Sequence, residues 1–239
     1  MQPNSNFAGL RVAITGGTSG LGLALVRLLC KEGAAVAFIA RSAPDVERIA
    51  EETGAVGIVG DVGRKDDIYP MALQVTGNLD GLDVLVNNAS SLGPTPLIPL
   101  ADTDCEDLET AIAVNLLGPF RLTKALFGAL AASARQQRGA FVINITSDAA
   151  TNAYSGWGAY GASKAALQHM TAIWSEEAQD SGIHLISVDP GDMDTQLHAA
   201  AIPDADPSTL KRPEESAAEI IERMRRILAD MPGPNGKPA

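Results

Sequence analysis

The sequence predicts an α/β protein in which one parallel β-sheet is covered by helices on both faces. Six short apolar runs recur along the 239 residues, helical patterns separate them, and a glycine-rich turn directly follows the first run. Apolar runs without polar alternation are typical of strands buried on both faces, and helical crossovers make such strands parallel. Because these crossovers are right-handed, we expect a single doubly wound domain over residues 1–239.

Each apolar run marks an expected strand, and each helical pattern marks an expected helix. The strands are expected at residues 10–15, 35–40, 55–60, 82–87, 140–146 and 183–189. The helices are expected at residues 21–31, 44–52, 64–76, 105–132, 157–180 and 213–229. Residues 203–213 are polar and contain three prolines, so 191–213 is expected to be a short loop, and residues 231–239 a flexible tail.

The charge balance excludes several classes of partner. With 18 basic and 29 acidic residues, the chain carries a net charge of -11, which is unsuited to nucleic acid or to an acidic membrane surface. No apolar run approaches the ~18 residues of a membrane helix, and residues 1–11 show no signal-peptide pattern. Two cysteines, Cys30 and Cys105, indicate neither a disulfide framework nor a metal cluster. We therefore expect a cytoplasmic protein without a bound metal.

The glycine-rich turn is the first candidate binding site. The segment TGGTSGLG, residues 15–22, lies between the first strand and the first helix. Glycines there allow a tight turn and the close approach of a pyrophosphate to the helix N-terminus, although a plain turn is the alternative. The expected dinucleotide contacts are Gly16, Thr18, Ser19, Gly20, Leu21 and Gly22.

The end of the second strand indicates which dinucleotide would bind. An acidic residue there would hold the ribose hydroxyl of NAD, but the sequence has Arg41 and Ser42 instead. An arginine can pair with the 2′-phosphate of NADP, so we expect NADP(H) in preference to NAD(H). A solvated surface arginine is the alternative. Asp61 and Val62 end the third strand, where Asp61 accepts from the adenine amino group or caps the next helix.

Tyr160 and Lys164, in the segment YGASK, are the first candidate catalytic residues. They lie four residues apart, so a helix places both on one face. A nearby ammonium lowers the pKa of a tyrosine from its usual value near ~10, which makes the phenol a usable proton donor and, in reverse, a base. Ser147 lies just past the fifth strand, where its hydroxyl can hold a carbonyl oxygen beside the tyrosine.

Three further residues are expected near the same rim. Asn87 and Ala89 stand at the end of the fourth strand. Asn115 lies inside an otherwise apolar helix, where a buried amide requires hydrogen-bond partners. A purely structural hydrogen bond is the alternative role for Asn115.

In order and spacing, these motifs resemble the classical branch of the short-chain dehydrogenase/reductase family across residues 15–195. The resemblance implies a Rossmann fold and a catalytic tetrad of Asn115, Ser147, Tyr160 and Lys164. It implies that tyrosine is the general acid/base, that serine orients the substrate oxygen, and that asparagine holds a water. Lysine would bind the nicotinamide ribose and lower the tyrosine pKa. Further implied cofactor contacts are Asn87, Ala89, Pro190, Gly191, Met193 and Thr195.

The sequence departs from the family pattern at two places. Ser90 stands where the family usually has glycine, and no apolar run follows the last helix. A seventh strand is therefore expected to be missing or vestigial. Since many relatives build a tetramer contact with that strand, we expect a homodimer through helices 105–132 and 157–180 instead.

The region after the sixth strand is expected to meet the substrate. Asp148, Asp192 and Asp194 indicate either helix capping or a pocket for a polar or cationic substrate. Tyr154, Trp157, Met193 and His198 are candidate pocket residues, although His198 is expected to be a surface residue rather than a catalytic one.

The expected function is an NADP(H)-dependent oxidoreductase that transfers hydride between nicotinamide and a carbonyl or secondary alcohol. A catalytically silent NADP(H)-binding regulator on the same fold is the alternative. An epimerase or dehydratase of the extended branch needs a larger C-terminal substrate domain than this chain has room for. The sequence does not specify the substrate, because pocket shape sets that choice.

Overall fold

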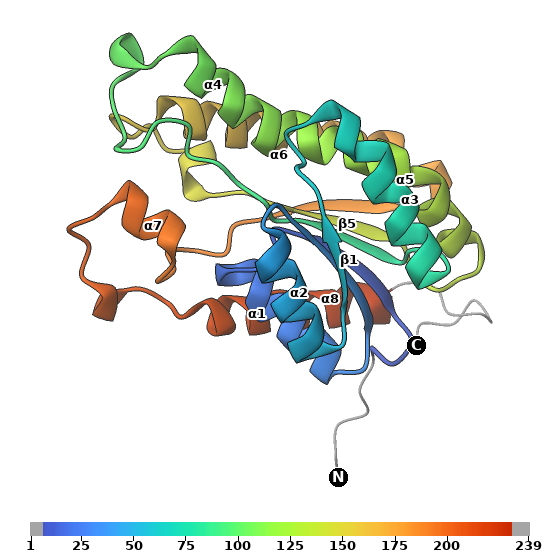
Figure 1. The fold of residues 1–239 in the computed structure, drawn as a ribbon. Coiled ribbons are helices and arrows are strands. Elements are labelled where there is room, and N and C mark those ends of the chain that lie inside the picture. The colour runs from blue at the N-terminus through green and yellow to red at the C-terminus, as the bar shows by residue number, and fades with distance from the viewer. Residues whose placement is uncertain (1–6, 231–239) are drawn as a thin grey trace.

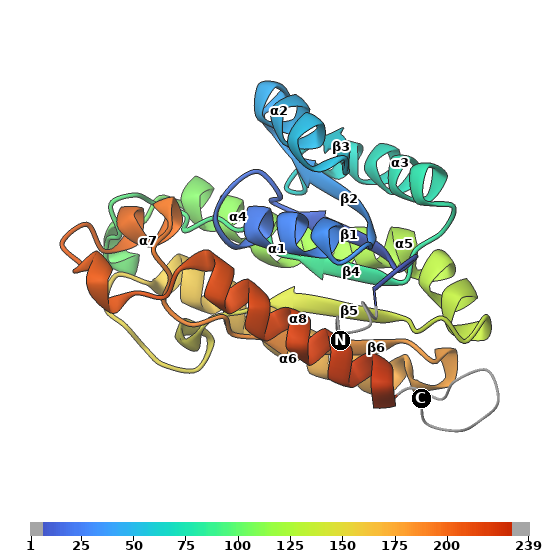
Figure 2. The same cartoon turned by 90° about the horizontal axis from the view of Figure 1, so that it is seen from below.

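Six strands form one parallel sheet in the computed structural model, which describes residues 7–230. The strands are β1 (Arg11–Thr15), β2 (Ala35–Ala40), β3 (Val56–Val59), β4 (Val84–Asn87), β5 (Phe141–Ile145) and β6 (His184–Val188). Figure 2 shows them in the order β3-β2-β1-β4-β5-β6. The predicted doubly wound architecture is confirmed, and the strands differ from their expected bounds by two residues at most. Because the order reverses between β1 and β4, a crevice is expected at their carboxyl ends.

Helices cover both faces of the sheet (Figure 1). One face carries α1 (Gly20–Lys31), α2 (Ala43–Thr53) and α8 (Pro213–Asp230). The other carries α3 (Ile68–Leu79), α5 (Gly118–Arg135) and α6 (Gly158–Glu177), with α4 (Cys105–Ile112) packed against α6. α8 ends at Asp230, the last described residue, so both the expected absence of a seventh strand after it and the expected tail at 231–239 lie outside the described residues.

The two-sided cover explains why most strand residues are apolar. Val12 and Ile14 of β1 pack in the core under α1 and α8, whereas Ala13 between them packs in the core on the other face. Successive side chains of a strand point to opposite faces, so both sets are buried only when both faces are covered. Each fully buried Val or Ile contributes about 1.5–3 kcal/mol relative to an exposed position.

The expected helix at 105–132 is not continuous. It consists of α4, a π-helical turn at Ala113–Leu117 and then α5. Pro119 has no backbone N–H and cannot make the regular bond to the carbonyl of Asn115, so the backbone widens there. The expected helix at 157–180 likewise ends earlier, with α6 followed by a 3-10 turn at Gln179–Ser181.

The segment 191–213 has more structure than the expected loop. It contains α7 (Gln196–Ala201) and a 3-10 turn at Pro207–Thr209. The side chain of Thr195 caps α7 by accepting from the backbone N–H of His198 (3.2 Å). The two ends of the segment are tied together, because Lys211 donates to the carbonyl of Asp192 (3.0 Å) and accepts from the N–H of Asp194 (2.9 Å). These bonds hold α7 in one place over the carboxyl edge of the sheet.

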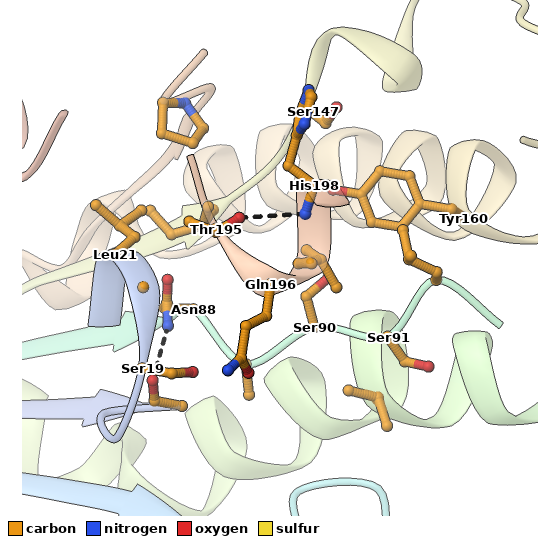
Figure 3. Close-up of a pocket in the computed structure, with 18 of the residues that line it drawn as sticks. Ser19, Leu21, Asn88, Ser90, Ser91, Ser147, Tyr160, Thr195, Gln196 and His198 are labelled. Carbon is orange, nitrogen blue, oxygen red and sulfur yellow. Dashed lines mark hydrogen bonds between the residues drawn. The ribbon is translucent and has the colours of Figure 1, made fainter. Parts of the chain in front are cut away.

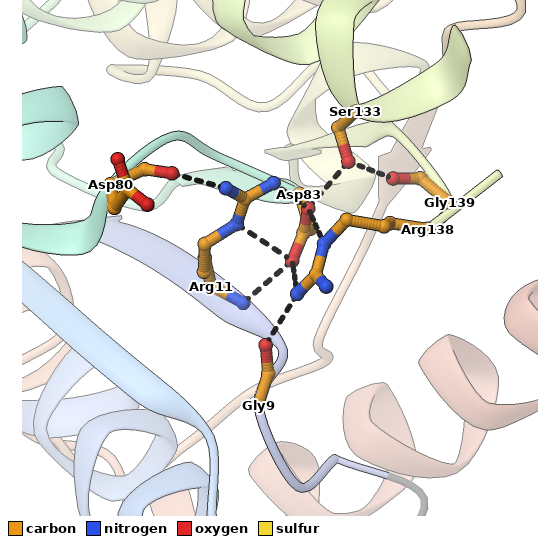
Figure 4. Close-up of polar contacts among 7 residues, drawn as sticks. All are labelled: Gly9, Arg11, Asp80, Asp83, Ser133, Arg138 and Gly139. Atoms are coloured by element: carbon orange, nitrogen blue, oxygen red, sulfur yellow. Dashed lines mark hydrogen bonds and ion pairs between the residues drawn. The ribbon is translucent and has the colours of Figure 1, made fainter. Parts of the chain in front are cut away.

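A buried ion cluster joins the strands at the opposite, amino-terminal edge (Figure 4). Asp83 is fully buried and accepts from Arg11 Nη2 (2.6 Å), from Arg138 Nη2 (3.2 Å) and from the Ser133 hydroxyl. Arg138 also donates to the carbonyl of Gly9 (2.7 Å). Burial acts to raise the pKa of Asp83, but the hydrogen bonds from Arg11, Arg138 and Ser133 outweigh it and hold the pKa below its usual value.

Within residues 7–230, none of the helices combines the length and apolarity needed to span a membrane.

Candidate active site

A cavity of about 760 Å³ opens at the carboxyl ends of the strands (Figure 3). It is lined both by the glycine turn after β1 and by residues that follow β5 and β6. Most of the predicted site residues line it: Gly16, Thr18, Ser19, Gly20, Leu21, Arg41, Ser42, Asp61, Val62, Ala89, Ser147, Tyr160, Lys164, Pro190, Gly191, Met193 and Thr195. Gly22, Asn87 and Asn115 do not line it, and the structure gives each a different place.

Gly22 is required by the turn rather than by the cavity. A Cβ atom at Gly22 would lie 2.1 Å from the carbonyl oxygen of Gly16 and 2.6 Å from Nδ2 of Asn88. Gly16 itself has a positive φ of 70°, a conformation that favours glycine. These two glycines let the chain reverse tightly, so that the N-terminus of α1 faces the cavity.

The ends of β2 and β3 form another part of the wall. Arg41 and Ser42 follow β2 directly and line the cavity, as expected. Asp61 also lines it, and its Oδ1 accepts from the N–H of Gly63 (2.8 Å). The carboxylate of Asp61 therefore helps to close the turn after β3 while facing the cavity.

Asn87 points away from the cavity, contrary to expectation, and Asn88 takes its place. The Asn87 side chain is buried and donates to Oδ1 of Asn144 (2.8 Å) and to the hydroxyl of Thr123 (3.2 Å). Asn144 in turn donates to the hydroxyl of Thr171 on α6 (2.8 Å). Neighbouring residues of a strand face opposite ways, so Asn88 lines the cavity.

Asn88 also fixes the glycine turn. Its side-chain amide donates to the backbone carbonyls of Thr15 (2.9 Å) and Gly16 (3.3 Å), and its backbone N–H donates to the Thr15 hydroxyl (2.9 Å). Asn88 is therefore a positioning residue for the turn.

Asn115, in the π-helical turn, is completely buried and makes four hydrogen bonds. Its Nδ2 donates to the carbonyl of Ser91 (2.7 Å) and to the Ser163 hydroxyl (2.8 Å). Its Oδ1 accepts from the N–H of Ser91 (2.8 Å) and from the Ser90 hydroxyl (3.2 Å). These bonds fasten the segment after β4 to α6, and the expected catalytic role of Asn115 stays a prediction.

Ser147, Tyr160 and Lys164 come together from the end of β5 and the start of α6. The Ser147 hydroxyl donates to Asp148 Oδ1 (3.1 Å), and the buried Lys164 Nζ donates to the carbonyl of Ile145 (2.8 Å). The Lys164 Nζ lies 5.5 Å from the centre of the Tyr160 ring. The predicted shared helix face of tyrosine and lysine is thus present in the structure.

The pKa shifts of this pair are set mainly by burial. Burial raises the pKa of Tyr160, and hydrogen bonding by Ser147 and Ser90 acts in the opposite direction without reversing it. This direction is opposite to the lowering expected from the lysine. Burial also lowers the pKa of Lys164, to about 8. Tyr160 is consequently a neutral phenol at pH 7.

The remaining candidates divide between the cavity and the surface. Trp157 lines the cavity, and its ring meets that of Tyr160 edge-on at 5.7 Å. His198 lines the cavity too and is not the surface residue that the sequence indicated. Tyr154 is exposed outside the lining and donates to Asp148 Oδ2 (2.6 Å). Ser91 and Gln196 also line the cavity and were not predicted, because neither belongs to a recurrent motif.

The strand reversal between β1 and β4, the glycine turn beside it and the cavity at that point define a doubly wound, dinucleotide-binding class of α/β protein. Within this class, the chain belongs to the short-chain dehydrogenase/reductase family, because the sequence model of the family described as short chain dehydrogenase matches residues 11–206.

Individual relatives agree with this assignment. A short chain dehydrogenase of Pseudocercospora fijiensis is 30% identical over 228 residues, which cover 92% of this chain and 69% of that protein. A serine 3-dehydrogenase of Agrobacterium fabrum is 31% identical over 189 residues, covering 78% and 73% of the two chains. The crystal structure of a short chain dehydrogenase of Escherichia coli CFT073 complexed with NADPH matches with a TM-score of 0.81 at 26% identity, covering 95% of this chain and 93% of the other.

Proposed function

We propose that the protein is an NADP(H)-dependent oxidoreductase that interconverts a carbonyl compound and the corresponding secondary alcohol. The observation that carries the proposal is one continuous cavity that is lined by the glycine turn, by Arg41 and by Ser147, Tyr160 and Lys164. The glycine turn would hold a pyrophosphate, and the catalytic side chains would hold the reacting oxygen.

The residues of the cavity fit a nicotinamide dinucleotide. The turn is a cradle that a Cβ at Gly22 would fill, and the N-terminus of α1 opens toward it. Arg41 supplies a cation for a 2′-phosphate, which supports NADP(H) over NAD(H). When bound, the nicotinamide would supply or accept the hydride. The NADPH complex of the similar structure from Escherichia coli supports a nicotinamide cofactor.

The protein's own side chains would handle the substrate oxygen and its proton. Ser147 would donate a hydrogen bond to the carbonyl oxygen and hold it beside Tyr160. Tyr160, protonated at pH 7 because burial raises its pKa, would donate its proton as negative charge develops on that oxygen. The buried ammonium of Lys164 would stabilise the phenolate that remains.

The test is oxidation of NADPH in the presence of ketones, aldehydes and diketones, measured beside NADH. Tyr160→Phe should abolish turnover and leave NADPH binding within severalfold of wild type. Tyr154→Phe is the matched control, because that hydroxyl lies outside the cavity lining, and it should retain turnover. Tight NADPH binding without turnover across the panel would instead favour the silent regulator.

We also propose that two copies associate through α4, α5 and α6. Leu108, Phe120 and Ile173 expose apolar side chains on these helices, which supports an interface between copies. Ile173→Arg should shift the protein to the monomer on size exclusion. Leu73→Arg on α3 removes an apolar side chain that is even more exposed than Ile173 but lies elsewhere, and it should leave the assembly unchanged. Equal behaviour of both variants would refute this interface.

A further inference from the structure

The segment that follows β4 packs against the catalytic tyrosine. Leu92 and Tyr160 belong to one small apolar cluster, so this segment lies beside the tyrosine ring. Ser90, two residues before Leu92, lines the same cavity as Tyr160 and Ser147 (Figure 3). The Ser90 side chain is half-buried, and its hydroxyl is bonded on the inner side to the buried amide of Asn115. Ser90 therefore stands between that amide and the cavity.

The acceptor of the Ser90 hydroxyl has a second donor. Asn115 Oδ1 accepts from the Ser90 hydroxyl at 3.2 Å and from the backbone N–H of Ser91 at 2.8 Å. The bond from Ser90 is the longer of the two, and a hydroxyl hydrogen can rotate to suit another acceptor. Because the Ser91 N–H remains in place, Asn115 Oδ1 keeps a partner when the Ser90 hydrogen turns away.

The amide hydrogens of Asn115 are committed elsewhere. Its Nδ2 donates to the carbonyl of Ser91 (2.7 Å) and to the Ser163 hydroxyl (2.8 Å). The Ser163 hydroxyl donates in turn to the backbone carbonyl of Tyr160 (2.7 Å). These hydrogens hold the structure together, whereas the hydrogen of Ser90 can move without leaving an amide atom unpaired.

The phenol oxygen of Tyr160 is the second acceptor for this hydrogen. Burial raises the pKa of Tyr160, and hydrogen bonding by Ser147 and Ser90 acts against that rise. A hydroxyl acts in this direction because it donates to the phenolate and stabilises the charged form. A phenolate is also a stronger acceptor than the neutral amide oxygen of Asn115. The Ser90 hydrogen should therefore turn toward Tyr160 as the tyrosine gives up its proton.

We propose that Ser90 is a catalytic residue whose hydroxyl donates a hydrogen bond to the Tyr160 oxygen while that oxygen is ionised. In reduction, the phenol O–H bond of Tyr160 breaks, the O–H bond of the product alcohol forms, and Ser90 keeps its own proton throughout. In oxidation, the same hydrogen bond stabilises the phenolate that accepts the proton of the alcohol. This inference rests on the proposed function, since it adds a residue to the same proton transfer.

The pH dependence of alcohol oxidation tests this role. The profile of kcat/KM is measured with NADP+ and the secondary alcohol that matches the best ketone of the panel, and it should rise as Tyr160 ionises. Ser90→Ala should move this rise upward by roughly one pH unit, because a hydrogen bond to a charged oxygen is lost. Ser90→Thr keeps a hydroxyl and should restore most of the wild-type profile.

Ser163→Ala is the matched control. It also removes a hydroxyl bonded to Asn115, but one that is bonded to the backbone of Tyr160. If Ser90 acted only through Asn115, both variants would shift the profile alike, and that result or an unshifted Ser90→Ala would overturn the proposal. The other titratable groups at this end of the cavity are the same in every variant: Lys164 on α6, Asp148 after β5, Asp189 after β6 and His198 on α7.

A second measurement does not depend on turnover. The chain has three tyrosines, so Tyr69→Phe combined with Tyr154→Phe, both at exposed positions, leaves only Tyr160. In this background, ultraviolet absorbance read directly after a rapid jump to alkaline pH reports the ionisation of Tyr160 before the chain unfolds. Adding Ser90→Ala should move the ionisation to higher pH, and coincident curves would overturn the role of Ser90. The expected shift without turnover of any carbonyl compound would instead refute the proposed reaction.

Discussion

Removing the charge of Asp83 should destabilise the fold without touching the active site. In Asp83→Asn, the guanidinium of Arg11, 14% exposed, loses the carboxylate that it contacts at 2.6 Å. Breaking a buried ion pair on one side costs about 3–5 kcal/mol, because the other charge remains buried. Arg138 is 41% exposed, so loss of its ion pair with Asp83 should lower the free energy of unfolding by at most about 1 kcal/mol. We therefore expect a loss of about 3–5 kcal/mol in urea unfolding at neutral pH.

The matched control is Asp45→Asn. Asp45 also pairs with an arginine, Arg48 at 3.0 Å, but on the exposed surface of α2. Because solvent screens such an exposed pair, Asp45→Asn should leave the urea midpoint close to that of wild type. Because the folded pKa of Asp83 is depressed, its contribution is present above the unfolded pKa near ~3.9 and is lost as pH falls through the folded value. Equal losses in the free energy of unfolding for Asp83→Asn and Asp45→Asn would refute the reasoning. A loss in Asp83→Asn that persists in acid would refute it as well.

Three other changes probe the cavity. Gly22→Ala should push the Gly16 carbonyl aside and weaken NADPH binding, measured by isothermal titration, roughly tenfold or more. In the control Gly128→Ala, the added Cβ meets nothing within 4 Å, so NADPH binding should be kept. Urea unfolding of this control should show α5 stabilised by about 0.5–1 kcal/mol. Arg41→Ala should weaken NADPH binding roughly tenfold and NADH binding far less. Equal losses of affinity for both cofactors in fluorescence titrations would show that Arg41 does not bind the 2′-phosphate. Burial lowers the pKa of Lys164 to about 8 from 10.5, so between these values the unfolded chain binds more protons and stability rises with pH. Lys164→Met should remove this rise in the free energy of unfolding, which is on the order of 3 kcal/mol. If the free energy of unfolding changes equally in wild type and Lys164→Met between pH 7 and pH 10, the reasoning is contradicted.

The apolar runs were sufficient to predict the sheet. The central strands β1, β4 and β5 are buried on both faces, so their apolar pattern is strong and local. The glycine turn and the pair Tyr160 and Lys164 were equally accessible, because their spacing fixes which side chains lie together. These predictions required only the residues within each motif.

The misplaced residues depend on contacts between distant segments. Which of Asn87 and Asn88 faces the cavity depends on the alternation of side chains at the end of β4, and no sequence motif fixes that alternation. The side-chain contacts of Asn115 depend on Ser91 and Ser163, which lie 24 and 48 residues away in the sequence. Asp83 precedes a strand in an ordinary polar turn, and its partners come from segments 50 or more residues away.

The chain of amides and hydroxyls from Thr123 through Asn87 and Asn144 to Thr171 has an evolutionary consequence. It links α5, β4, β5 and α6 in the interior, and each hydrogen bond pairs one member with the next. Replacing one member by an apolar residue leaves its neighbour unpaired, whereas replacing adjacent members together removes the cost. These four positions should therefore change together among close relatives. Most relatives should have either all four polar or all four apolar, and few should combine the two.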